Sequence, residues 1–248
     1  MKKEILAEGV VHYIFDAKPD RRFATSVTAI FNGNKVTLID TAYESQVAEL
    51  LEEFSKNKVE VEQVIITHFH EDHIEGLKLL TGVPIYGIDC FGETLNKFIE
   101  KEEHHYFTPS IIVTEPLSLA YGEHNLTLIP FPGHSKCGML IKINDRFVHI
   151  GDELLFGTNG MPLLPLSDGF DLQRHLDSLE RLEGYAEYTL IPSHGPIFSG
   201  EKLVAEIKNR YRYLKALHDH DRSISYEDAT KECDCTFLHN EWHEWIRK

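Results

Sequence analysis

The chain has 248 residues and a mass of 28.5 kDa, and its formal net charge is −15 with a sequence pI near 5.4. This acidic balance argues against nucleic acid or an anionic membrane as a partner, because phosphate contact normally uses clustered Lys and Arg. The sequence contains neither a recognisable signal peptide nor an apolar membrane span. Its four cysteines match no disulfide framework or zinc-finger spacing, so we expect a reduced, cytoplasmic protein.

Apolar runs alternate with turns and amphipathic patterns through the N-terminal half. The turn Asn-Gly-Asn-Lys between two apolar runs predicts a β-hairpin. The apolar spacing from Val47 to Phe54 predicts an amphipathic helix. Strands are expected at residues 10–15, 26–31, 36–40, 61–68 and 83–88. Helices are expected at residues 44–57, 73–80 and 92–103.

The second half repeats this order of strands and helices. Strands are expected at residues 124–134, 139–144, 146–152 and 188–196, and a helix at 171–182. Two similar halves of this kind predict sheets with helices on their outer faces. We expect a catalytic domain at residues 1–200 and a helical extension at 201–248, because a long polar helix begins directly after Gly200.

The segment VIITHFHEDHIEG, residues 64–76, carries a dense group of metal-ligand side chains after an apolar strand. These side chains are His68, His70, Asp72 and His73. Further candidates follow other apolar strands: His134, Asp152 and His194. Side chains at strand ends can converge on one cleft where loops meet. We therefore treat the seven residues as one metal site and not as a histidine-rich loop.

The seven side chains are five imidazoles and two carboxylates, a set suited to two divalent ions. Zinc is the expected metal, with iron and manganese as alternatives. The turn after the strand can point the motif's first two histidines to one side and Asp72 with His73 to the other. Asp152 is expected to bridge the two ions, because a carboxylate has two oxygens whereas an imidazole has one free lone pair.

The segments THFHEDH, PGHS, GDELLF and PSHGP, in this order, resemble the motifs of the metallo-β-lactamase-fold hydrolase superfamily over residues 10–200. The resemblance implies an α+β fold, a four-layer αβ/βα sandwich with a binuclear site at one edge of the sheets, here followed by the C-terminal extension. It implies that one metal is held by His68, His70 and His134. It implies that the other is held by Asp72, His73 and His194, with Asp152 between the two metals.

The resemblance also implies hydrolysis, in which a metal-bound hydroxide attacks a carbonyl or phosphorus centre that the metals polarise. Asp72 is then the catalytic residue that orients the nucleophile and shuttles its proton.

This sequence departs from three better-known branches of the superfamily. The β-lactamases of this fold generally lack a bridging aspartate, and acyl-homoserine lactonases place a tyrosine at the position of Leu155. Glyoxalase II enzymes carry a Cys-Gly-Arg segment that residues 154–166 lack. These departures leave a small ester-type substrate: a thioester, a lactone or another ester.

Three alternatives remain open at this stage. One is an iron-dependent oxygenase of the same fold, with a single iron on His68, His134 and Asp152. The others are a phosphodiesterase and a binding protein that keeps the metals without turnover. The apolar residues 154–166 favour a substrate with a hydrophobic portion, although core packing explains them equally well. Residues 201–248 could shape the pocket, cap a sheet edge or form a homodimer contact.

Other histidines of the chain are expected to have structural or solvated roles. A solvent-facing loop is expected at residues 104–106, and a solvated helix cap at residues 218–221. The tail helix with His239 and His243 is expected to pack its tryptophans on the core or on a partner. Cys137 is expected to be a core thiol close to the site, and His149 a packed core residue.

Overall fold

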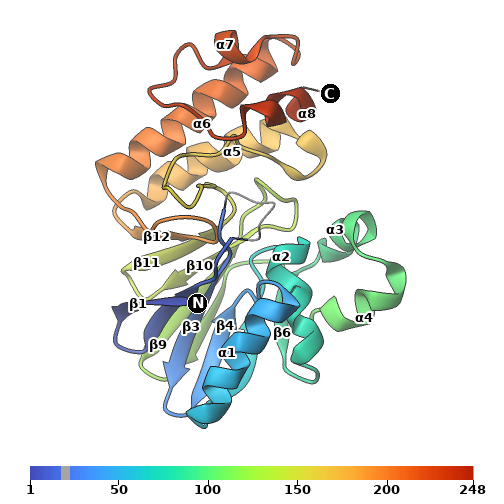
Figure 1. Ribbon diagram of the computed structural model, residues 1–248, viewed down its shortest axis with the longest axis vertical. Helices are drawn as coiled ribbons and strands as arrows, with labels where there is room; N and C mark the ends of the chain where they lie inside the picture. The colour runs from blue at the N-terminus through green and yellow to red at the C-terminus, as the bar shows by residue number, and fades with distance from the viewer. Residues whose placement is uncertain (18–22, 248) are drawn as a thin grey trace.

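The computed structural model describes residues 1–17 and 23–247, apart from the side chain of Phe170. Within these residues, two β-sheets form the centre of the molecule and helices cover their outer faces (Figure 1). This arrangement confirms the α+β, four-layer αβ/βα sandwich expected from the sequence.

The first sheet has seven strands in the order β1-β2-β3-β4-β5-β6-β7. Its strands are β1 (Lys2–Ala7), β2 (Val10–Ile14), β3 (Ser26–Asn32), β4 (Lys35–Ile39), β5 (Glu60–Ile65), β6 (Ile85–Ile88) and β7 (Ile111–Val113). Strands β1 to β4 pair antiparallel, whereas β4 to β7 pair in parallel. The carboxyl ends of β4, β5 and β6 therefore lie at the same edge of the sheet.

The second sheet has five strands in the order β12-β11-β10-β9-β8. Its strands are β8 (Leu117–Tyr121), β9 (His124–Pro130), β10 (Met139–Ile143), β11 (Phe147–Gly151) and β12 (Thr189–Pro192). Pairing is antiparallel except between β11 and β12, which are parallel. The parallel pair brings two further strand ends to one edge.

Helices lie on the outer faces and at the ends of the sheets (Figure 1). The α-helices are α1 (Glu44–Lys56), α2 (Glu71–Ile74), α3 (Phe91–Phe98), α4 (His104–Phe107), α5 (Leu172–Leu182), α6 (Glu201–Asp219), α7 (Tyr226–Ala229) and α8 (His243–Ile246). The 3₁₀-helices are η1 (Glu75–Leu79), η2 (Lys101–Glu103), η3 (Asp168–Phe170), η4 (Glu183–Tyr185) and η5 (Asn240–Trp242). None of the described helices is both long and apolar enough to cross a lipid bilayer.

Three apolar clusters fill the three interfaces between the four layers. Successive side chains of a strand point to opposite faces of its sheet. Accordingly, Val64 of β5 packs in the cluster under α1 with Leu50, whereas Ile65 packs between the sheets with Leu128. The third cluster joins the outer face of the second sheet to α5 and α6. This burial on both faces explains the apolar run Val64–Ile66 at the carboxyl end of β5.

The sequence patterns missed three strands, all at sheet edges. Strands β1 and β7 are the two edges of the first sheet, and β8 is one edge of the second. Strand β1 buries none of its side chains completely, and β7 has only three residues. An edge strand with little burial carries a weak hydrophobic signal, which is why the patterns did not indicate these three.

The helix expected at residues 73–80 is instead a single turn, α2, followed by the 3₁₀-helix η1. Gly76 lies at this change. Its backbone packs so closely on Thr41 that a β-carbon there would lie 2.5 Å from the Thr41 carbonyl oxygen. The close contact with the loop after β4 constrains the path of the helix.

The C-terminal residues pack as part of the same molecule. Helix α6 contacts α5, and its Leu203, Leu214 and Leu217 belong to the apolar cluster on the second sheet. The fully buried Arg210 of α6 donates a hydrogen bond from Nη2 to the Leu155 carbonyl oxygen at 2.6 Å.

The boundary expected at residue 200 coincides with the start of α6, and the division into two domains stays a prediction. The helical tail expected up to Lys248 consists of short turns as far as 247, and Lys248 itself lies outside the described residues.

Candidate metal centre

All seven predicted ligands lie beyond the carboxyl ends of strands, at one edge of the sandwich. Strand β5 leads into the turn that carries His68 and His70, and α2 follows with Asp72 and His73. The other three follow β9, β11 and β12: His134, Asp152 and His194. The structure brings all seven together in two adjacent clusters, with five of them buried and His70 and Asp72 partly exposed.

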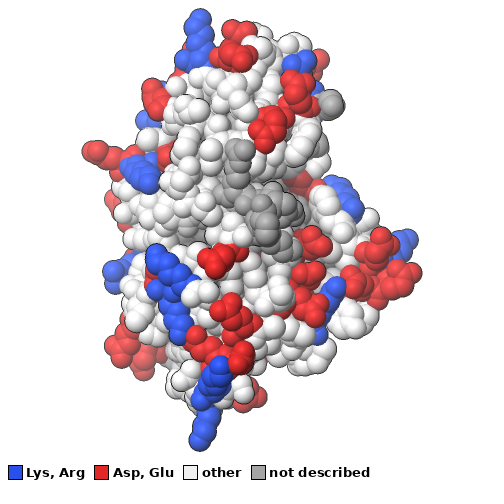
Figure 2. All heavy atoms as spheres, in the orientation of Figure 1, with Lys and Arg blue, Asp and Glu red and all other residues white. Residues whose placement is uncertain are grey.

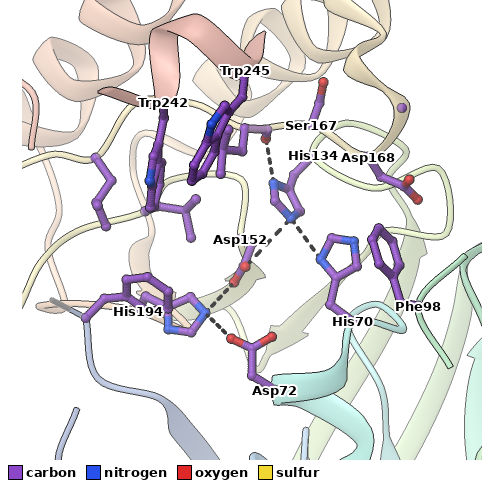
Figure 3. A pocket seen from close by; sticks show the side chains of 15 residues that line it. His70, Asp72, Phe98, His134, Asp152, Ser167, Asp168, His194, Trp242 and Trp245 are labelled. Atoms are coloured by element: carbon purple, nitrogen blue, oxygen red, sulfur yellow. Dashed lines mark hydrogen bonds and ion pairs between the residues drawn. The ribbon is translucent and has the colours of Figure 1, made fainter. Parts of the chain in front are cut away.

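The first cluster consists of His68, His70, His134 and Asp152. The Nδ1 atom of His70 lies 2.9 Å from Nε2 of His68 and 3.2 Å from Nε2 of His134. The Oδ2 atom of Asp152 lies 3.7 Å from each of those two Nε2 atoms. One ligand atom from each side chain therefore points at a common centre, as the dashed lines of Figure 3 show in part.

The second cluster consists of Asp72, His73 and His194. The Nε2 atom of His194 lies 3.4 Å from Oδ2 of Asp72, and Nε2 of His73 lies 3.8 Å from its Oδ1. These separations exceed the 2.7–2.9 Å of a charge-assisted hydrogen bond. The three side chains surround a second centre beside the first.

Asp152 is the side chain that links the two clusters. Its Oδ2 faces the first cluster, whereas its Oδ1 lies 3.4 Å from Nε2 of both His73 and His194. This Oδ1 is buried and has no hydrogen-bond partner among the described residues. One oxygen toward each centre is the arrangement that a bridging carboxylate requires.

The hydrogen bonds behind the clusters fix which imidazole nitrogens carry protons. The Nδ1 atom of His134 donates to the Leu166 carbonyl oxygen at 2.7 Å, and Nδ1 of His194 donates to the Ala24 carbonyl oxygen at 2.6 Å. In the neutral form of each ring, Nε2 then has a free lone pair that points inward. Lone pairs that converge without protons between them repel one another unless a cation lies among them, so the donor set fits a metal.

Asp40, which the motif search did not select, supports both clusters from behind. It ends β4, is fully buried, and accepts hydrogen bonds from His73 Nδ1 at 2.8 Å and from Thr67 Oγ1 at 2.8 Å. Thr67 Oγ1 in turn lies 3.1 Å from Nδ1 of His68. Such outer carboxylates orient ligating histidines and raise their basicity. The sequence could have indicated Asp40, because it directly follows the apolar strand β4, just as the ligands follow their strands.

Gly151 allows Asp152 to reach its position. Its φ is +54°, a left-handed conformation that favours glycine. A β-carbon at Gly151 would also lie 3.1 Å from the side chain of Thr67. The turn at the end of β11 can therefore lie against the turn after β5, which places Asp152 next to the histidines of the motif.

Burial and neighbouring charge divide the histidines into two kinds. Burial, with the adjacent imidazoles, holds the pKa of His68 well below its ordinary value, lowers the pKa of His70 to about 4, and lowers the pKa of His134. Burial acts in the same direction on His73 and His194, but the carboxylates around them outweigh it. The pKa of His73 is raised well above its ordinary value, mainly by Asp152 and Asp40, and that of His194 is raised to about 10, mainly by Asp152.

A cavity of about 330 Å³ opens onto both clusters. Its polar side includes His70, Asp72 and His194, and Figure 3 shows Trp242 and Trp245 above them. The apolar residues among 154–166 serve both purposes that the sequence allowed, a surface for a hydrophobic substrate and core packing. Leu155, Leu163 and Leu166 line the cavity, and the first two of them also belong to the core cluster. Leu154, Phe156 and Leu164 belong to that core cluster without lining the cavity.

Most of the other histidines have the structural roles expected of them, but the loop expected at residues 104–106 is wrong, because these residues belong to helix α4. The side chains of His104 and His105 bond to nearby carbonyl oxygens and do not line the cavity. Residues 218–221 lie exposed at the end of α6, and His149 is buried in β11. The buried thiol of Cys137 contacts Thr94 and Ser135 in the core, as expected. In the tail, His243 bonds to Tyr213 Oη and His239 stacks on Trp242, whose ring also lines the cavity.

Comparison with known proteins agrees with this geometry. The family model described as Metallo-beta-lactamase superfamily matches residues 20–194. The chain is 25% identical over 186 residues to the "Beta-lactamase-like protein 2 homolog" of Drosophila melanogaster, covering 70% of this chain and 59% of that protein. It is 24% identical to the "Hydroxyacylglutathione hydrolase" of Haemophilus ducreyi, covering 73% of this chain and 70% of that protein. The chain thus spans less than two thirds of the Drosophila relative.

The fold is also found among solved structures. The "Metallo-beta-lactamase from Pontibacter korlensis" superposes with a TM-score of 0.69 at 18% sequence identity, covering 84% of this chain and 99% of that one. At this identity, the likeness concerns the fold alone.

Proposed function

The chain belongs to the metallo-beta-lactamase superfamily and is a metal-binding hydrolase, and from this premise we propose that it uses two metal ions to cleave a small ester-type substrate. The observation that carries the proposal is Asp152, whose two oxygens face two separate clusters of ligand side chains. In this proposal one metal is held by the first cluster and the other by the second, with Asp152 between them. Zinc is the metal we propose, because imidazole and carboxylate ligands suit it.

When bound, the metals would supply Lewis-acid chemistry, polarising the scissile carbonyl and activating water. The chain's own contribution comes largely from Asp72. Burial opposes its ionisation, but the nearby imidazoles of His194 and His73 hold the pKa of Asp72 well below its usual value. Asp72 also lines the cavity. An ionised carboxylate there can hold a water molecule in orientation and accept its proton.

The ester-type substrate is proposed on two grounds. Relatives at 22–24% identity carry the name hydroxyacylglutathione hydrolase, which describes hydrolysis of an acylated glutathione. Among the described residues that line the cavity, the charged carboxylates are Asp72, Asp152 and Asp168, and none is Lys or Arg. Apart from the proposed metal ligands, that lining is mostly apolar, which suits an ester with an apolar portion.

The second cluster also bears on the oxygenase alternative. A single iron on His68, His134 and Asp152 would leave the second cluster without a task. Its three side chains nevertheless point their ligand atoms at one centre, and the outer carboxylate Asp40 orients His73. This completeness favours two metals.

We further propose a cytoplasmic setting and a small-molecule partner. The net charge is −15, and on the face shown in Figure 2 Lys and Arg are dispersed among Asp and Glu and form no single patch. The four cysteines are free thiols, as expected of a reduced protein. Neither nucleic acid nor a membrane is proposed as a partner, and a homodimer stays a prediction.

Metal analysis combined with a substrate panel tests the proposal. We expect two metals per chain and hydrolysis of thioesters, lactones or esters in preference to phosphodiesters and β-lactams. Asp72→Ala should abolish hydrolysis while circular dichroism stays unchanged. The matched control is Asp145→Ala, which removes a fully exposed carboxylate and should keep full turnover. One iron per chain with oxygen uptake, or full turnover by Asp72→Ala, would overturn the proposal.

A further inference from the structure

The cavity above the metal clusters has two chemically different sides. Its floor carries the ligand side chains, and its remaining lining is mostly apolar. The apolar lining residues are Phe23, Phe98, Leu155, Leu163, Leu166, Trp242 and Trp245. A substrate that places its reacting carbonyl on the floor therefore has to place its remaining atoms against this apolar lining.

The two tryptophans come from the extreme C-terminal segment. Trp242 and Trp245 stack with ring centroids 6.1 Å apart, and His239 stacks on Trp242 at 4.4 Å. Phe23 meets Trp242 edge to face at 6.4 Å and meets His194 at 4.8 Å. These ring contacts thus extend from the tail down to a residue of the second cluster.

Two aromatic rings at this cavity are exposed to solvent. Trp245 and Phe98 are each 53% exposed. Three further large hydrophobic side chains are exposed among the described residues, Ile5, Leu79 and Ile112, and none of these lines the cavity. Scattered exposed apolar residues need no explanation, but two exposed rings on one cavity beside a reaction centre indicate a binding surface.

The tail that carries the tryptophans is tied to the loop after Asp152. The Leu238 amide donates to the Pro162 carbonyl oxygen at 2.8 Å, and Arg210 holds the Leu155 carbonyl oxygen. The apolar wall is therefore fixed before a ligand arrives, which reduces the entropic cost of binding.

We propose that Trp245, Trp242 and Phe98 bind an apolar acyl group of the substrate and make the enzyme selective for longer acyl esters over acetyl esters. This inference rests on the proposed ester hydrolysis at the same site. The cavity volume of about 330 Å³ lies at the small end of the 300–1,000 Å³ range of ligand pockets. The cavity therefore limits the length of the acyl group that it can hold. Each buried methylene group is worth about 0.8 kcal/mol, so kcat/KM should rise about fourfold per methylene until the cavity is full.

Binding can be tested without catalysis, because the chain has only two tryptophans and both line the cavity. Primary alkanols from ethanol to octanol are neutral and offer no acyl bond to cleave. Added to the metal-loaded enzyme, they should change tryptophan fluorescence saturably, with affinity rising with chain length. In Trp245→Ala, Trp242 still reports, and the affinity for octanol should fall about tenfold. Ile112→Ala, which removes an exposed apolar side chain far from the cavity lining, should bind octanol as the unchanged enzyme does.

Hydrolysis of acetyl, butyryl, hexanoyl and octanoyl thioesters provides the second measurement. The ratio of octanoyl to acetyl kcat/KM should fall about tenfold in Trp245→Ala and in Phe98→Ala, but not in Ile112→Ala. Chain-length-dependent alkanol binding without hydrolysis of any thioester, lactone or ester would support the apolar subsite and contradict the proposed function. Hydrolysis with no chain-length dependence and no saturable fluorescence change would contradict the subsite and leave the proposed function standing.

Discussion

The two clusters use the same kinds of side chain but differ in charge. The first cluster contains three imidazoles and receives one carboxylate oxygen, from Asp152. In the second cluster two imidazoles face Asp72 and the other Asp152 oxygen, and Asp40 lies behind one of them. The histidine pKa values are accordingly lowered in the first cluster and raised in the second.

The opposite pKa shifts of the histidines mean that the two clusters bind a metal in different ways. In the metal-free protein the first cluster offers neutral imidazoles with free lone pairs, ready to bind a cation. The second cluster holds protons between its imidazoles and carboxylates, and a metal has to displace them. A site of the first kind loses little when pH falls moderately, whereas one of the second kind competes directly with protons.

The largest expected effect comes from removing the residue that the clusters share. Asp152→Ala deletes an oxygen from each cluster, so metal content should fall below two per chain and kcat/KM should fall at least about a hundredfold, more than for an outer residue. Elemental analysis and steady-state kinetics measure both quantities. Retention of two metals with unchanged turnover would show that the clusters do not depend on a common carboxylate.

A smaller effect is expected when the second cluster loses a direct hydrogen-bond partner and the first cluster loses only an indirect one, through Thr67. Asp40→Asn removes the charged acceptor of His73 Nδ1, so one of two metal-binding events should weaken by about 10–100-fold. Competition with a chromophoric chelator resolves the two events. Asp168→Asn is the matched control, since it alters a buried carboxylate paired with Lys97 and should leave both affinities intact. Equal weakening of both events by Asp40→Asn would contradict the division into unlike clusters.

The smallest expected effect is the pH dependence of the metal-free protein. Because the folded-state pKa of His194 is raised to about 10, its contribution to stability is complete below the ordinary value of 6.5 and is lost as pH rises through about 10. The melting temperature of chelator-treated protein should therefore fall between pH 6.5 and pH 8.5, relative to metal-loaded protein. The loaded protein serves as reference because it contains the same buried thiols and tyrosines. Parallel melting curves across this range would contradict the protonated second cluster.

Much of the fold followed from local patterns, and the failures have a common cause. Central strands such as β10 carry strong apolar runs because both faces are buried. The edge strands β1, β7 and β8 lack that signal, and their pairing depends on neighbours that no local pattern describes. The short helix at Glu71 was misjudged because Gly76 packs on a loop more than thirty residues earlier in the chain.

The candidate site, like the fold, has features that local sequence patterns predict and features that depend on contacts between distant segments. The ligand types, their order and their positions after apolar strands are local features, and they determined the expectation of a two-metal hydrolase. The role of Asp40 was not predicted. For the tail tryptophans, the sequence predicted packing on the core or on a partner, but not a place in the cavity lining. Both omissions depend on contacts between distant segments: Asp40 with His73, and Trp242 with Phe23.

The sequence by itself thus determined the chemistry of the site, since imidazole and carboxylate donors select metals wherever they gather. Only the tertiary structure decided which oxygen of Asp152 faces which cluster, which histidines are charged without metal, and which apolar wall covers the cavity. The physical reason is that charge and burial depend on everything within a few ångströms, and at this site those neighbours come from both sheets and from the last residues of the chain.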